Sequence, residues 1–286
     1  MQDEQLKPGD VIKRHRLSTR IWHWTNALTL LVMLMSGLMI FNAHSRLYWG
    51  EYGANSDKAW LVIDDAGETG FVEVAGFRVE TTGVLGLWKD SEGEVKRRAF
   101  PHWLTIPSGY DLQAARRWHS TFAWILAGAL TLYMLRSLWN GHVRQDLHIR
   151  KWEWSPRHIW HDIKSHARLR FPTGEAAKNY NILQKISYIG VIFVLLPLII
   201  FTGLTMSPAM NAAWPWLLDI FGGRQSARSL HFIAAFALAA FFFVHIAMVV
   251  LAGPINEVRS MITGKYKLPG KAEPLPEPEL PQGETA

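Results

Sequence analysis

Hydrophobic residues gather along this chain into four long blocks that polar segments separate. The blocks cover about residues 21–41, 119–138, 186–206 and 230–252. Each approaches or reaches the roughly 20 apolar residues that a helix needs to cross a bilayer. Lipid offers no partner for backbone N–H and C=O groups, so each block should form a helix. The pattern predicts an all-α integral membrane protein with a bundle of four transmembrane helices, the third kinked but not broken at Pro197.

The polar segments between the blocks differ in length and pattern. Residues 43–115 form an unusually long connection, in which F-V-E-V-A-G-F-R-V alternates and D-S-E-G-E is typical of a turn. We expect a few short strands in this outer loop. The loop could serve as a docking platform or as a cover over the outer ends of the helices, and the alternative is a passive insert. A second connection covers 139–182. The membrane domain should cover 1–267, and the Pro- and Glu-rich tail 268–286 should be disordered.

Basic residues are distributed unevenly between the two sides that four spanning helices define. The connection 139–182 holds eight Lys and Arg against four Asp and Glu, and more basic residues crowd the N-terminus. By the positive-inside rule, we expect both termini in the cytoplasm and the loop outside, in a multi-pass protein of the bacterial inner membrane. No small-residue cleavage site follows the first block, which predicts an uncleaved anchor. These flanks account for the net charge of +6, so no nucleic-acid partner is expected.

Two histidines of the fourth block, His231 and His245, are fourteen residues apart. On a helix they project within roughly 40° of each other and are separated by about 21 Å along the axis. His23 matches the depth of His245, and His119, at the start of the second block, matches the depth of His231. A ring nitrogen in lipid needs a partner. The pattern predicts two ligand pairs, His23 with His245 near the cytoplasm and His119 with His231 near the outer face.

Each of these histidines also has a simpler interpretation, a hydrogen bond to a neighbouring carbonyl. His44 competes with His119 as an outer ligand, although it lies beyond the first block and close to Arg46. His102 falls in the outer loop. The other histidines fall in basic cytoplasmic segments and are interpreted as solvated: His15, His142, His148, His158, His161 and His166.

The chain contains no cysteine. This excludes disulfides, thiolate-bound iron–sulfur clusters, thiolate zinc sites and the covalent attachment of c-type haem. Neutral imidazole is a good axial ligand of iron, so the paired histidines point chiefly to two noncovalent haems b.

Two haems b carry four carboxylates that need positively charged partners. Arginines stand two or three residues before three of the paired histidines, where their guanidinium groups can bind these carboxylates. The alternative is that the side chains extend to lipid headgroups. The arginines are Arg20 at the inner haem and Arg116, Arg117 and Arg228 at the outer haem. Glycines inside the helices allow close helix packing or leave room for a macrocycle: Gly37, Gly128, Gly190 and Gly203.

Three segments carry a resemblance to a known family. R-H-R-L-S-T-R-I-W-H-W at 14–24, R-R-W-H at 116–119, and L-H at 230–231 with a second histidine at 245 resemble the membrane cytochrome b subunits of formate dehydrogenases, nickel–iron hydrogenases and thiosulfate reductases, which are similar to bacterial cytochrome b561. The resemblance covers all four helices. It implies two haems b on the same histidine pairs, a membrane quinone near the cytoplasmic haem, and a redox subunit docked on the outer face.

The outer loop is longer than in the formate dehydrogenase and hydrogenase members. Y-W-G-E-Y-G at 48–53 and P-H-W-L-T-I-P-S-G-Y-D-L at 101–112 resemble the thiosulfate reductase branch instead. The expected partner is a periplasmic molybdenum-containing or multihaem subunit.

The sequence therefore predicts a membrane cytochrome b that passes electrons between the quinone pool and a periplasmic partner, as a subunit of a quinone-linked oxidoreductase. The direction of flow stays open, and no catalytic residue is predicted. No motif marks the quinone site, for which Arg20 and Asn26 are candidates by position alone. One alternative is a stand-alone cytochrome b561-type quinol oxidoreductase acting on a small oxidant. An alternative of another class is a transporter or anchor without haem.

Overall fold

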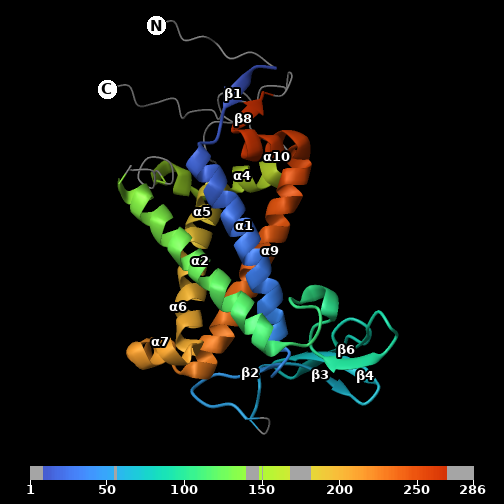
Figure 1. Ribbon diagram of the computed structural model, residues 1–286. Helices are drawn as coiled ribbons and strands as arrows, with labels where there is room; N and C mark the ends of the chain where they lie inside the picture. Colours follow the sequence, from blue (N-terminus) through green and yellow to red (C-terminus); the bar gives the residue numbers. More distant parts are fainter. Residues whose placement is uncertain (1–8, 55–56, 140–147, 150, 168–181, 269–286) are drawn as a thin grey trace, which may run out of the picture. The chain divides into compact units, whose positions relative to one another are not determined.

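Four long helices form from the four apolar blocks. The computed structural model describes residues 9–54, 57–139, 148–149, 151–167 and 182–268. Within these residues, four helices are long and apolar enough to cross a membrane: α1 (Leu17–Phe41), α2 (Leu112–Trp139), the third span (Ile182–Met206) and α9 (Arg224–Ala252). The predicted four-helix membrane bundle is confirmed (Figure 1).

Each spanning helix begins four to seven residues before the apolar block that predicts it. In α2 the reason is a helix cap, because the Asp111 carboxylate accepts a hydrogen bond of 2.9 Å from the backbone N–H of Ala114. The polar residues after Asp111 then continue the helical hydrogen bonds. The sequence had predicted His119 at the start of the helix. It lies instead about two turns inside α2.

The third span changes its helical pitch near its middle. α5 (Ile182–Ile189) continues into the π-helical segment η4 (Gly190–Leu195) and then into α6 (Leu196–Met206). Pro197 lacks an N–H and its ring crowds the preceding turn, which the wider π turn accommodates. The span stays continuous through this proline.

The chain separates into two compact units. The smaller comprises residues 1–20, 149–183 and 248–286, and the larger comprises 21–148 and 184–247. In the smaller unit, β1 (Val11–Lys13) pairs antiparallel with β8 (Lys265–Lys267), which follows α10 (Pro254–Thr263). This unit also contains η2 (Lys151–Trp154) and α4 (Pro156–Ala167). Most of the predicted connection 139–182, and the predicted tail after residue 268, lie outside the described residues.

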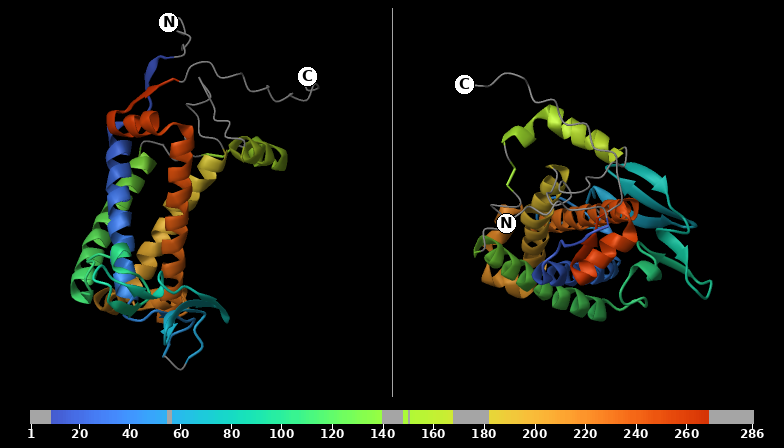
Figure 2. Two further views of the ribbon diagram at one scale, coloured as in Figure 1. Left: turned by 90° about the vertical axis from the view of Figure 1, so that its right-hand side faces the viewer. Right: turned by 90° about the horizontal axis from the view of Figure 1, so that it is seen from above.

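The outer loop of the larger unit folds into short strands, as predicted. One antiparallel sheet has the order β2 (Arg46–Leu47), β3 (Leu61–Ala66), β4 (Thr69–Val74) and β5 (Phe77–Glu80), and β6 (Gly86–Lys89) pairs with β7 (Val95–Arg98). The alternating run becomes the β4–β5 hairpin, whose two turn residues, Ala75 and Gly76, have positive φ. Figures 1 and 2 show these strands at the end of the bundle where α1 ends and α2 begins.

Two clusters of buried apolar side chains hold the larger unit together. One lies among the helices and contains Met33, Leu126, Leu130, Leu196, Ile199, Ala234 and Leu238. The other joins the end of α1 to the loop and contains Leu38, Phe41, Leu47, Leu61, Ile63, Ala99 and Phe100. Asn42 adds two hydrogen bonds to the backbone of Phe100, at 3.0 and 2.7 Å. Short elements complete the unit: η1 (His102–Leu104), α7 (Pro208–Ala213) and α8 (Trp216–Ile220).

Candidate functional site

The larger unit brings four histidines together in two pairs. The rings of His119 on α2 and His231 on α9 have centroids 6.2 Å apart. The rings of His23 on α1 and His245 on α9 have centroids 6.1 Å apart. We call the first the loop-side pair, because it lies toward the strands, and the second the far pair. α9 contributes one ring to each, as the fourteen-residue spacing requires.

The ring spacing distinguishes a metal-bridged pair from a directly hydrogen-bonded one. Two imidazoles joined by an N–H···N bond of up to about 3.2 Å have centroids at most about 5.5 Å apart. Two imidazoles on opposite sides of a metal, with bonds of about 2.0 Å, have centroids about 6.2 Å apart. Both observed separations match the second arrangement. Each pair therefore has room for a metal ion between its two imidazoles.

Hydrogen bonds determine which nitrogen of His119 is available. Its Nδ1 lies 3.1 Å from the carbonyl oxygen of Met33 and 3.2 Å from the Ser36 hydroxyl. A carbonyl oxygen only accepts, so Nδ1 carries the proton and donates it. The Ser36 hydroxyl is free to accept as well, because its own proton goes to the Val32 carbonyl at 2.7 Å. Nε2 of His119 is left with a lone pair.

His231 is held by the same kind of contact from another helix. Its Nδ1 lies 3.0 Å from Oγ1 of Thr202 on α6, and that hydroxyl donates its proton to the Leu198 carbonyl at 2.6 Å. Nδ1 of His231 is therefore the donor, and its Nε2 also keeps a lone pair. Such partners orient metal-binding histidines and raise their basicity.

Glycines follow both hydroxyl residues and allow the rings to approach. A Cβ on Gly37 would lie 3.3 Å from Cε1 of His119, and a Cβ on Gly203 would lie 3.2 Å from Cε1 of His231. A Cβ built on Gly128 or Gly190 would meet no described atom within 4 Å outside its chain neighbours and the backbone of its own helical turns. Ser36–Gly37 and Thr202–Gly203 are thus two copies of one dipeptide pattern, a hydroxyl residue followed by glycine, each facing one ring of the loop-side pair.

The far pair has different surroundings. The His23 ring meets the indole of Trp24 edge-on at 5.1 Å, and the His245 ring stacks on Phe241 at 5.9 Å. Nδ1 of His23 is buried and has no hydrogen-bond partner among the described residues. Asn26 donates its amide hydrogen to the Trp22 carbonyl at 2.7 Å. Both imidazoles of the far pair therefore contact aromatic rings.

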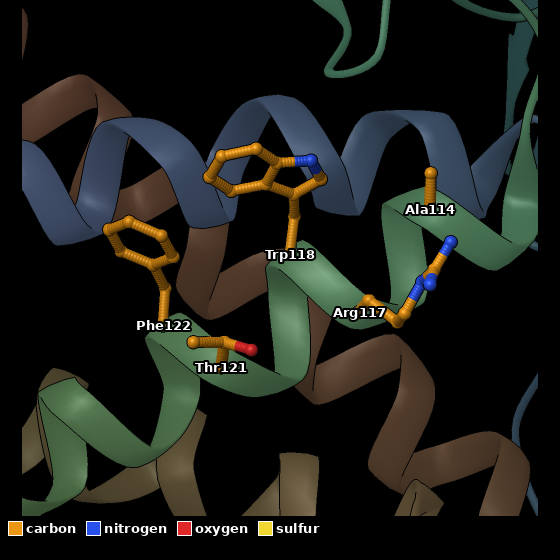
Figure 3. Close-up of a pocket in the computed structure, with 5 residues that line it drawn as sticks. All are labelled: Ala114, Arg117, Trp118, Thr121 and Phe122. Atoms are coloured by element: carbon orange, nitrogen blue, oxygen red, sulfur yellow. The ribbon is translucent and has the colours of Figure 1, made fainter.

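The candidate arginines occupy different environments. Arg228 is half-buried and donates to the carbonyls of Arg46, at 2.7 Å, and of His44. Nε of Arg20 is buried and has no hydrogen-bond partner within the described ranges. Arg116 and Arg117 are exposed. Figure 3 shows Arg117 in a shallow depression of about 300 Å³ that residues of α2 alone line: Ala114, Arg117, Trp118, Thr121 and Phe122. None of the paired histidines lines this depression.

The remaining histidines are distributed over both units. His44 follows α1, and its ring stacks on Tyr48 at 5.7 Å. Burial, and then the positive charges of Arg228 and Arg46, lower the pKa of His44. His158 and His161 flank Asp162 in α4. His142 and the side chain of His166 lie outside the described residues.

Comparisons with known proteins identify the family of this chain. The family described as prokaryotic cytochrome b561 matches residues 14–264. A protein of Azospira oryzae, named as the YedZ1 subunit of a protein-methionine-sulfoxide reductase, is 30% identical over 154 residues, which are 53% of this chain and 74% of that protein. A protein of Escherichia coli K12, named as the cytochrome YdhU, is 23% identical over 262 residues, 91% of this chain and 76% of that protein. No solved structure matches.

Proposed function

Because this chain belongs to the prokaryotic cytochrome b561 family, whose members are membrane proteins that bind haem b and transfer electrons, we propose that it carries electrons through two haems b. The resemblance inferred from the sequence is confirmed at the level of this family. The two haems, their ligands, the quinone and the partner belong to the proposal.

The observation that carries the proposal is the pair of ring separations. His119 with His231 would bind one haem iron, and His23 with His245 the other, because both separations equal that of two imidazoles across a metal. Haem b supplies a reversible one-electron couple of iron. In the loop-side pair, the Nδ1 atoms are hydrogen-bonded to Ser36, Met33 and Thr202, which orients the rings and leaves each Nε2 lone pair for the iron.

The protein keeps water away from the path between the two pairs. His231 and His245 are about 21 Å apart along α9, and buried Ala234 and Leu238 lie between them on the same helix. Met33 of α1 and Leu126 of α2 pack into the same cluster. Such an apolar interior has few polar groups that must reorient when charge moves, which would reduce the reorganisation that accompanies each electron transfer.

The proposed electron donors and acceptors lie on opposite sides of the membrane. We place a quinone near the far pair, and a redox subunit containing molybdenum or several haems on the loop, with both termini in the cytoplasm and the loop in the periplasm of a bacterium. The relative from Azospira oryzae is named as a reductase subunit, which supports a partner of this kind. The loop also exposes Tyr52 and Phe77, each 82% accessible, at its surface.

The first test is the haem content of the purified full chain. We expect a reduced-minus-oxidised spectrum of b type and two haems per chain by the pyridine haemochrome assay, with reduction by a short-chain quinol. A spectrum without b-type bands would exclude an electron-transfer function. A single haem per chain would contradict the second pair of ligands.

The second test concerns the partner. A tagged chain purified in mild detergent should bring down a molybdenum-containing or multihaem subunit encoded by the same organism. A matched variant with Tyr52→Ser and Phe77→Ser should bind less of it while keeping both haems. If the tagged chain purifies alone and its reduced form is reoxidised directly by a small oxidant, the stand-alone alternative is correct.

A further inference from the structure

A positive charge without an acidic partner lies at the loop end of α9. Arg228 is half-buried, and no Asp or Glu of the described residues lies within 4.0 Å of its guanidinium group. Its neighbour Arg46, in contrast, forms an ion pair of 3.0 Å with Asp64. Arg228 donates only to backbone carbonyls in that region, and it packs over the ring of Phe41 at 5.4 Å. A partly buried cation of this kind is stabilised by an anion.

Two buried polar atoms beside Arg228 also have no partner. The Tyr48 hydroxyl and Nε2 of His44 are both buried and make no hydrogen bond to any described residue. Tyr48 is only 2% exposed, and its ring is stacked on that of His44. Leaving a buried polar group unsatisfied is unfavourable, so two such groups together point to a polar ligand that binds here.

The three side chains interact with one another. The phenol of Tyr48 and the guanidinium of Arg228 are close enough to interact electrostatically, and so are Arg228 and the imidazole of His44. The His44 backbone carbonyl accepts a hydrogen bond from the same guanidinium. The cation and the two unsatisfied polar atoms thus belong to one cluster, contributed by α9 and the segment that follows α1.

The cluster is held in place by bonds to the first turns of α9. Ser229 donates its hydroxyl to the Tyr48 carbonyl at 2.5 Å, and the N–H of Gly50 donates to Ser226 Oγ at 2.7 Å. A Cβ on Gly53 would overlap the ring of Tyr48. These contacts restrict the loop and the phenol before any ligand binds, which is the preorganisation that a binding site requires.

We propose that His44, Tyr48 and Arg228 form a carboxylate-binding cluster that holds the propionates of the haem bound by the loop-side pair. Arg228 is three residues before His231, so it lies on the same face of α9 and about 4.5 Å nearer the loop. Haem b carries two carboxylates on one edge, and the cluster offers one cation, one phenol donor and one imidazole. The assignment rests on the proposed function and gives His44 a role other than that of an iron ligand.

The test is a redox titration of variants that remove single polar groups. Tyr48→Phe deletes only the hydroxyl, and His44→Phe keeps a ring on Tyr48 but deletes both nitrogens. Each should lower the midpoint potential of the loop-side haem, because a carboxylate with fewer donors stabilises oxidised iron. We expect up to a tenfold change in the ratio of reduced to oxidised haem, about 59 mV for a one-electron couple. The redox couple of the loop-side haem is identified as the one that is absent from the titration of His231→Ala.

Two controls make the result specific. Tyr110→Phe removes a hydroxyl from an exposed tyrosine of the same loop and should shift neither couple. The couple of the far pair should stay unchanged in every variant. Unchanged potentials in both Tyr48→Phe and His44→Phe, or equal shifts of both couples, would overturn the proposal. Loss of both haems from Tyr48→Phe would also overturn it, because the role would then be structural.

A second measurement identifies the source of the carboxylate. Protein reconstituted with the dimethyl ester of haem b should bind it more weakly at the loop-side site than haem b itself. In the double variant His44→Phe/Tyr48→Phe, this difference should shrink at least threefold. If the wild-type potential instead responds to added acetate and the ester binds equally well, the ligand is a free carboxylate and the proposal is wrong. Absence of any haem would overturn the proposed function itself.

Discussion

The loop-side and far histidine pairs have nearly the same ring separation but different surroundings. At the loop-side pair, three polar atoms accept hydrogen bonds from the two Nδ1 atoms, and two glycines allow the rings to approach α1 and α6. At the far pair, aromatic rings of Trp24 and Phe241 contact the imidazoles, and Nδ1 of His23 is buried without a partner in the described part of the chain. Hydrogen bonds orient both rings of the loop-side pair, whereas the His23 ring of the far pair is positioned without a hydrogen bond to Nδ1 among the described residues.

This difference has a consequence for cofactor binding. Hydrogen bonds to the second nitrogen fix both the tautomer and the ring angle of a ligand, and their loss typically weakens metal binding 10–100-fold. Both ligands of the loop-side site are therefore oriented before haem arrives, whereas at the far site Nδ1 of His23 has no such bond to a described residue. We expect the loop-side haem to dissociate more slowly.

The largest effect is expected from removing a ligand. His231→Ala should lose the loop-side haem and keep the far one, and His245→Ala should do the reverse, because each variant leaves one pair intact. Haem per chain by pyridine haemochrome should fall by half in both. His161→Ala, an exposed histidine of α4, is the control and should keep both haems. Loss of both haems from either change would contradict independent pairs.

The next effect concerns the glycines that face the loop-side pair. Gly203→Val should displace the His231 ring, because even a Cβ lies 3.2 Å from it, and most of the loop-side haem should be lost. Gly128→Val on α2 is the matched control, because a Cβ there meets no described residue within 4 Å beyond its own helical turns. Haem content and the spectrum of the remaining haem measure the outcome. Retention of both haems in Gly203→Val would show that haem binding does not depend on the close approach of the His231 ring to position 203.

A smaller effect is expected from the hydroxyl partner. Thr202→Val keeps the shape of the side chain but removes the acceptor of the His231 Nδ1 proton, so haem release from the loop-side site should speed up about tenfold. Transfer of haem to excess apomyoglobin measures the rate. The control is Thr131→Val, which removes a hydroxyl that donates to the Ala127 carbonyl on an exposed face of α2. The rate of haem release should stay unchanged in this variant. An unchanged rate of haem release in Thr202→Val would show that the hydrogen bond to His231 does not stabilise haem binding at the loop-side site.

The smallest effect belongs to the far pair. Phe241→Leu removes the ring stacked on His245, which costs about 0.5–1.5 kcal/mol. Release of the far haem should speed up by about threefold in the same transfer assay, and the loop-side haem should be unaffected. Phe243→Leu, a 68% exposed residue two positions along α9, serves as control. A larger effect than that of Thr202→Val would reverse the comparison.

Much of the fold could be predicted from local pattern. Apolar blocks predicted the four membrane helices, and alternation with turn residues predicted the strands of the loop; both are confirmed. The starts of the helices could not be read from hydrophobicity. Backbone hydrogen bonds continue into polar turns wherever a cap such as Asp111 allows it, and this moved His119 into the interior of α2.

Less of the site could be predicted. The four histidines and their depths follow from spacing along helices, but the sequence interpretation left open whether its glycines serve helix packing or a macrocycle. The structure distinguishes Gly37 and Gly203, which face imidazoles, from Gly128 and Gly190, which do not. The repeated order of a hydroxyl residue followed by glycine, at 36–37 and 202–203, is the signal that could have found them.

The sequence by itself determined the class of the protein. Helical periodicity places His231 and His245 on one face of one helix, and the lack of cysteine limits the cofactors, because both properties are independent of the rest of the fold. The tertiary structure decided what surrounds each ring. The contacts of His119 with Ser36, of His231 with Thr202, and of Arg228 with His44 join segments 29 to 184 residues apart. Such contacts depend on how each helix is rotated and packed against its neighbours, which no local pattern specifies.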